Sequence, residues 1–94
     1  MATSRQRSDL DEQKLIEKHI DLDYDQYPYR RADVWLRDSG ASVWAIVMFL
    51  DMYEGDRDKL AEHFEISQEE IDAALAYYRR NKKYVDARIT LNEA

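Results

Sequence analysis

The 94-residue chain contains no cysteine, only one proline and only two glycines. Without cysteine it has neither a disulfide framework nor a thiolate metal site. So few glycines and prolines leave few turn signals, which favours helices over a fold of many short strands. A run of about 20 apolar residues is also missing, and the N-terminus lacks the apolar stretch of a secretory signal. We therefore predict one small, soluble, cytoplasmic domain that makes no membrane contact.

The charge is negative overall and unevenly distributed. Twenty acidic residues against 14 basic residues give a formal net charge of -6. Nine acids lie between residues 51 and 72, whereas five bases lie between residues 79 and 88. The chain is therefore electrically polarised along its C-terminal half. The overall sign argues against strong non-specific binding to polyanions, because attraction to phosphates supplies most of that affinity.

The first helix is predicted close to the N-terminus. Residues 1–7 are small and polar without a pattern, and we expect them to be disordered, with a single helical domain over residues 8–94. Ser8 stands three residues before Asp11, which is the spacing of a capping box. This spacing predicts a short amphipathic helix over about residues 9–18.

A short extended segment is predicted after this helix. From residue 20 to residue 25, apolar and acidic residues alternate with the period of a half-buried strand. A strand of this length is not stable alone and needs a partner. The partner is either residues 31–36 of the same chain or the same strand of a second chain.

The most apolar segment lies between Ser42, a predicted N-cap, and Gly55, a predicted C-cap. Its apolar residues occupy nearly the whole circumference of a helix of about three turns, so this helix needs cover on almost all sides. One interpretation is a central core helix. The alternative is a dimer interface in which Trp44, Met48 and Met52 face a second subunit.

The next segment has the spacing of a helix-turn-helix. Asp56 is placed to cap one short helix, and Ser67 with Glu70 predicts a capping box that begins a second helix. Glu65 stands where a turn glycine is usual, so we expect it near left-handed geometry. These patterns predict a mainly α fold with a three-helix core over about residues 42–81, preceded by the short extended segment.

Beyond Asn81 the apolar phase continues, which predicts a long C-terminal helix. Two apolar stripes would lie on it, one with Val85 and Ile89 and the other with Tyr84 and Leu91. Either these four residues are anchors for a binding partner, or they pack back on the N-terminal helix.

Residue patterns that carry catalysis or hold metals are not found in the sequence. His19 and His63 lie on amphipathic segments without the spacing of a metal site. Residues from Asp21 onward imitate the start of a calcium loop, but Gln26 replaces the required glycine and Ala32 the required glutamate. We therefore predict a protein that is not an enzyme and that uses no metal and no cofactor.

A helix-turn-helix suggests DNA binding, with the start of its second helix in the major groove. Here that start contains Glu69 and Glu70, whose carboxylates DNA phosphates would repel. A separate basic set is the candidate for nucleic-acid contact, although a solvated basic helix end is the alternative meaning. The members of this set are Arg30, Arg31, Arg79, Arg80, Lys82 and Lys83.

The sequence carries a family resemblance from Val43 to Ile89, in the segments VWAIV, LAEHFEIS, IDAALAYYRRN and VDARI. These segments resemble the small bacterial domain-of-unknown-function family 433, most closely in AALAYY over residues 73–78. The similarity covers residues 20–91, but the family's G-x-P-x-I-x-G-T-R-I segment is reduced here to Pro28. The resemblance implies a helix-turn-helix domain, often dimeric, encoded beside PIN-like ribonuclease toxins and acting as their antitoxin.

Two functional hypotheses follow from the residues and the resemblance together. In the first, the protein is a non-enzymatic interaction module of a toxin-antitoxin system, which binds and neutralises a PIN-like toxin through its C-terminal anchors. In the second, it is a dimeric DNA-binding regulator of its own operon that uses the basic set. A homodimer with an unrelated scaffolding role is a third possibility.

Overall fold

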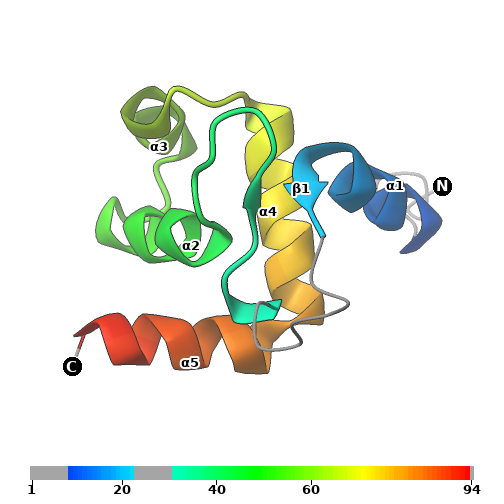
Figure 1. Cartoon of the computed structure of the whole chain (residues 1–94). Helices are drawn as coiled ribbons and strands as arrows, with labels where there is room; N and C mark the ends of the chain where they lie inside the picture. The colour runs from blue at the N-terminus through cyan, green and yellow to red at the C-terminus, as the bar shows by residue number, and fades with distance from the viewer. Residues whose placement is uncertain (1–8, 23–30, 94) are drawn as a thin grey trace, which may run out of the picture.

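The computed structural model describes residues 9–22 and 31–93. Within these ranges the protein is mainly helical, as predicted, with five helices and two short strands (Figure 1). In chain order the elements are α1 (Asp9–His19), β1 (Ile20–Asp21), β2 (Trp35–Leu36), α2 (Val43–Met52), α3 (Arg57–Phe64), α4 (Gln68–Arg80) and α5 (Lys82–Glu93). The disorder predicted for residues 1–7 lies outside the described residues.

Helix α4 is the central element, and α1, α2, α3 and α5 all contact it. In Figure 1, α1 lies on one side of α4, α2 and α3 lie on the other side, and α5 crosses below. Both strands and every helix except α1 contribute fully buried apolar side chains. The largest are Tyr77, Ile20, Leu36, Ile46, Leu60, Ile71, Val43 and Val85. Burial of these side chains supplies the main stabilising free energy of the fold.

The predicted strand finds its partner within the same chain. Strand β1 pairs antiparallel with β2, with Ile20 opposite Leu36 and Asp21 opposite Trp35. Both Ile20 and Leu36 are fully buried, so the pair places two apolar side chains in the core. The remainder of the predicted strand, after residue 22, lies outside the described residues.

The helix caps predicted for α3 and α4 are confirmed. The Asp56 carboxylate accepts a hydrogen bond from the backbone N–H of Lys59 at 3.1 Å. Ser67 and Glu70 form a reciprocal capping box, with N–H to side-chain oxygen distances of 2.9 and 3.0 Å. Glu65 adopts left-handed geometry with φ of 56°, as its place in the turn predicts.

Helix α2 begins after Ser42 as predicted, although the Ser42 side chain makes no capping hydrogen bond. The C-cap is Tyr53 and not Gly55. Glu54, with φ of 56°, takes the left-handed position after the cap, and the N–H of Gly55 donates to the carbonyl of Leu50 at 2.9 Å. This Schellman-type ending satisfies the last carbonyls of the helix without a glycine at the first left-handed position.

The prediction of one long C-terminal helix is corrected, because the helical run divides at Asn81 into α4 and α5. The side-chain amide of Asn81 donates to the carbonyl of Tyr77 at 3.0 Å, beside the last turn of α4. The backbone carbonyl of Asn81 accepts from the N–H groups of Tyr84 and Val85, in the first turn of α5. This single residue ends one helix and begins the next, and α5 then packs against α2 rather than against α1.

No helix in the described parts of the chain combines the length and the apolar composition needed to cross a membrane.

Candidate functional site

A groove of about 550 Å³ lies between α2 and α5, and the end of α4 closes one side. Helix α2 provides half of its lining, α5 provides most of the rest, and α4 contributes one tyrosine. The lining residues are Val47, Met48, Asp51, Met52, Tyr78, Asp86, Ile89 and Glu93. This size falls within the range of cavities that bind ligands or short segments of partners.

The two helices that form the groove run in the same direction (Figure 1). The Arg88 guanidinium lies 4.4 Å from the centre of the Trp44 ring. Four residues further along both helices, the side-chain amide of Asn92 is 3.7 Å from the sulfur of Met48. The C-terminal ends of α2 and α5 therefore lie at the same end of the groove.

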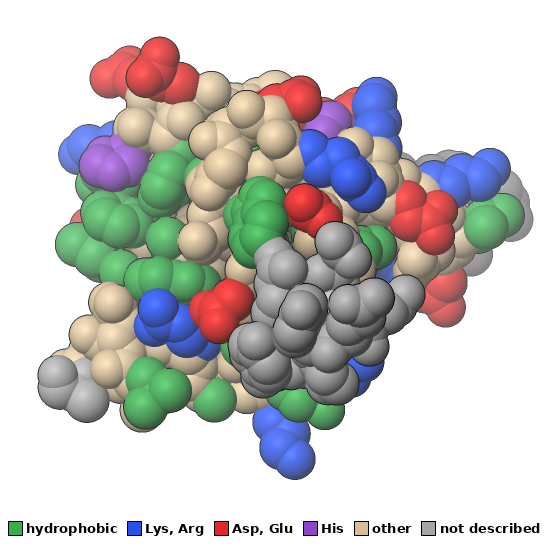
Figure 2. Space-filling view, in the orientation of Figure 1, with side chains coloured by type: hydrophobic (Ala, Val, Ile, Leu, Met, Phe, Trp, Pro, Cys, Tyr) green, Lys and Arg blue, Asp and Glu red, His purple; other side chains and the backbone are tan. Residues whose placement is uncertain are grey.

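Four of the eight residues that line the groove are aliphatic or methionine, and this part of the wall is adaptable. Val47, Met48 and Ile89 are partly buried, whereas Met52 is 61% exposed. Unbranched methionine side chains fit surfaces of different shape, which is typical of protein docking sites. Figure 2 shows hydrophobic side chains gathered over α2, on the side of the molecule above α5.

A hydrogen-bonded cluster of Tyr78, Lys82 and Asp86 borders the groove near the start of α5. The Tyr78 hydroxyl donates to Asp86 at 2.7 Å, and the Lys82 ammonium donates to the Tyr78 oxygen and to Asp86, both at 2.9 Å. The hydrogen bond from Tyr78, and then the one from Lys82, lower the pKa of Asp86. The same contacts raise the pKa of Lys82. Asp86 is therefore ionised, and its charge is offset by Lys82.

The other end of the groove is acidic. Asp51 lies in the last turn of α2, Glu93 lies in the last turn of α5, and neither turn contains a basic residue. Helix C-termini already carry partial negative charge, so these carboxylates add to it. Among the residues that the structure describes, no cation pairs with Asp51 or Glu93.

Of the three residues that the sequence proposes for a dimer interface, two line the groove and one does not. Met48 and Met52 line the groove beside Ile89, which the sequence assigns to the partner anchors. Trp44 lies outside the groove, under the guanidinium of Arg88, which also donates to Asp33 at 2.8 Å. Residues predicted for two different surfaces thus meet in one place.

The four predicted C-terminal anchors do not form one surface. Val85 is fully buried in the core, so its prediction as a partner contact is corrected. Successive residues of an α-helix are about 100° apart, so Leu91 projects about 200° away from Ile89. Leu91 is 71% exposed, and Tyr84, also exposed, lies 5.1 Å from the Arg31 guanidinium.

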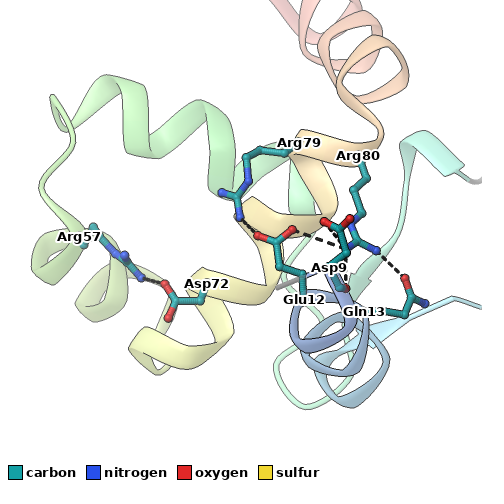
Figure 3. Close-up of polar contacts among 7 residues, drawn as sticks. All are labelled: Asp9, Glu12, Gln13, Arg57, Asp72, Arg79 and Arg80. Atoms are coloured by element: carbon teal, nitrogen blue, oxygen red, sulfur yellow. Dashed lines mark hydrogen bonds and ion pairs between the residues drawn. The ribbon is translucent and has the colours of Figure 1, made fainter. Parts of the chain in front are cut away.

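Two of the basic residues proposed for nucleic-acid contact, Arg79 and Arg80, form hydrogen bonds and ion pairs with α1. Figure 3 shows Arg79 paired with Glu12 of α1, and Arg80 reaching across to the same helix. Arg80 donates to the backbone carbonyl of Asp9 and to the side chain of Gln13, each at 2.7 Å. These two arginines hold α1 on α4, which reduces the charge they offer to a polyanion.

The remaining members of the basic set have different surroundings. Lys82 belongs to the cluster with Tyr78 and Asp86, and Arg31 lies over the ring of Tyr84. Lys83 is exposed at the start of α5. Arg30 lies outside the described residues. Arg31, Arg79, Arg80 and Lys82 thus each contact other groups of this chain.

Neither histidine belongs to a metal-binding group within residues 9–22 and 31–93. His63 lies in an aromatic cluster between α2 and α3, with its ring centre 4.8 Å from that of Phe49 and its Nδ1 3.0 Å from the Tyr53 hydroxyl. His19 ends α1, and its Nε2 is 2.5 Å from the carboxylate of Glu69 on α4. Lys18 contacts the same carboxylate at 2.9 Å.

Acid is expected to weaken the contact between α1 and α4. The hydrogen bond from His19, and then the contacts of Lys18, lower the pKa of Glu69 from its usual 4.5 to about 2. Because the folded-state pKa is depressed, this stabilisation is present above about pH 4.5 and is lost as the pH falls towards 2.

Denaturant unfolding of the natural protein and of Glu69→Gln at a series of pH values checks this expectation. The difference in unfolding free energy between the two should shrink as the pH falls from 4.5 towards 2. Glu62→Gln, on an exposed face of α3, is the control and should show no such trend. A difference that stays constant through this range would contradict the assigned role of Glu69.

Comparison of the chain with protein-family models, curated proteins and solved structures gives no match.

Sequence reasoning missed most of the groove. Val47, Asp51, Tyr78, Asp86 and Glu93 line it but were not among the predicted site residues. The sequence contains two signals for these residues. Lys82 and Asp86 have the i,i+4 spacing of an ion pair within a helix. Asp51 and Glu93 lie in the last turns of their helices, where basic residues are the favourable ones. Neither signal indicates that α2 and α5 lie side by side.

Proposed function

We propose that the protein is a non-enzymatic binding module that neutralises a partner protein by docking through the groove between α2 and α5. The resemblance to family 433 makes a PIN-like ribonuclease toxin the proposed partner and an antitoxin the proposed role. The observation that supports docking most directly is the groove itself, where Met48, Met52 and Ile89 offer apolar side chains to the solvent. Such side chains in a concave surface are the usual anchors of protein interfaces.

The alternative proposal, a dimeric DNA-binding regulator of its own operon, has weaker physical support. Glu69 and Glu70 stand in the first turn of α4, the position from which a recognition helix would approach phosphates. Arg79 and Arg80 are occupied by the carboxylates of α1. DNA binding would therefore require other contacts, or the release of α1.

Co-expression with a PIN-like ribonuclease encoded by a neighbouring gene tests the docking proposal. We expect the two proteins to co-purify and the nuclease to be inhibited. Met52→Gln should raise the inhibition constant about tenfold, because a well-placed apolar anchor contributes about 1.4 kcal/mol or more to binding.

Leu10→Gln is the matched control for this experiment. Leu10 on α1 is 64% exposed, close to the 61% of Met52, but it does not line the groove. We expect Leu10→Gln to inhibit as strongly as the natural protein. Equal inhibition by Met52→Gln would remove the groove from the interface, and an uninhibited nuclease would contradict the antitoxin role.

A further inference from the structure

We infer that the groove takes a basic amphipathic helix of the partner, whose apolar face meets Met48, Met52 and Ile89 while its cations meet Asp51 and Glu93. This inference rests on the proposed function and adds the chemistry of the segment that is recognised.

The charge of the groove selects a cationic occupant. Helices α2 and α5 run in the same direction and end together, with Asp51 and Glu93 in their last turns. The partial negative charges of two helix C-termini thus add to two carboxylates. In the described part of the chain no lysine or arginine compensates them, so a positive group from outside would.

The length of the groove suits two turns of helix. Its α5 side extends from Asp86 to Glu93, which corresponds to about 10 Å at 1.5 Å per residue. A helix of that extent presents apolar residues at i, i+4 and i+7 on one face. Three such anchors match the apolar walls, and basic residues beside them reach the acidic end.

A second copy of this chain is a poorer occupant than a basic partner. Each copy carries a formal charge of -6, so association of two copies is opposed electrostatically. Helix α5 has an outward face with Tyr84 and Leu91, but its Arg88 is held by Asp33 and covers Trp44. The cation that this face would bring to a neighbouring groove is therefore already engaged.

The test titrates the full-length protein, labelled with ¹³C at its methionine methyl groups, with designed peptides of about 14 residues. One peptide carries leucines at i, i+4 and i+7 and lysines on its polar face, and a second carries glutamates in place of the lysines. Met48 and Met52 line the groove, so the signals of their methyl groups report on its occupation.

The lysine peptide is expected to shift the signals of Met48 and Met52 and to bind at least tenfold more tightly than the glutamate peptide. Its affinity should fall several-fold when the salt concentration rises from about 0.05 to about 0.5 M. The double variant Asp51→Asn and Glu93→Gln should weaken the lysine peptide about fivefold to tenfold. Glu62→Gln on α3 should leave binding unchanged.

Three other outcomes would overturn the inference. If the glutamate peptide binds equally well, the groove is a docking site without preference for cations. If neither peptide moves the signals of Met48 and Met52, the groove does not bind such helices. The proposed function is then tested separately, by comparing nuclease inhibition by Met52→Gln with inhibition by the natural protein. If the two signals move with protein concentration alone, a second copy fills the groove.

Discussion

Replacement of Tyr77 by alanine is expected to lower the free energy of unfolding by about 3–5 kcal/mol, as for other large aromatic residues removed from a core. Tyr77 is 1% exposed on the inner face of α4, and it is the largest fully buried side chain of the described residues. Its hydroxyl donates a hydrogen bond of 2.6 Å to the backbone carbonyl of Arg31. The side chain therefore joins the central helix to the segment that leads into β2.

The matched variant Tyr77→Phe separates the ring from the hydroxyl. It keeps the ring but leaves the Arg31 carbonyl without this donor, and we expect a loss of about 1–2 kcal/mol. Urea unfolding followed by circular dichroism measures both variants. A loss below about 1 kcal/mol for Tyr77→Ala would show that the ring does not pack as the structure has it.

Val85→Ala is expected to lower the free energy of unfolding by about 2 kcal/mol, the transfer free energy of two methylene equivalents plus the cost of a cavity. Val85 is fully buried where α5 meets the core. The variant Leu91→Ala, six residues further along α5, shortens a side chain that is 71% exposed. We expect it to change stability by no more than about 0.5 kcal/mol.

This pair of variants separates the two interpretations of the C-terminal stripes. Val85 as a core residue requires a loss of stability, measurable by thermal or urea unfolding of the isolated protein. Val85 as a free anchor would give no loss in the isolated protein and a loss only in complex formation. If Val85→Ala unfolds at the same urea concentration as the natural protein, α5 does not pack on the body as described.

Local signals in the sequence located most of the fold. The pairing of Ser67 with Glu70 marked the start of α4, and Asp56 marked the start of α3, because each side chain bonds backbone groups only three residues away. The alternation from residue 20 predicts a strand whose partner is either residues 31–36 or the same strand of a second chain, and β1 pairs with β2 of the same chain. Such signals depend only on residues that are close together in the sequence, so a single sequence is enough to find them.

The division of the C-terminal helix was not predictable in the same way. Asn81 is tolerated inside helices, and the apolar phase of Val85 and Ile89 continues that of Tyr78. After the break α5 packs against α2, and Val85 is buried in the core. That contact joins residues about 40 positions apart in sequence, and no local pattern contains it.

The candidate site was predicted only in part for the same reason. Met48, Met52 and Ile89 were identified from their apolar spacing, but as members of two separate surfaces. Arg79 and Arg80 were identified from their charge, whereas their partners on α1 lie 67 or more positions earlier in the chain. Sequence periodicity identifies which side chains share one face of a helix. The packing of the helices determines which of those side chains remain exposed for binding.

The single-residue junction at Asn81 fixes the rotation of α5 about its own axis. One additional residue there would turn every following side chain by about 100°, since an α-helix has 3.6 residues per turn. Val85 would leave the core, and the carboxylates of Asp86 and Glu93 would leave the groove. Insertions and deletions at this position are therefore far more damaging than substitutions, because they change the phase of a whole helix at once.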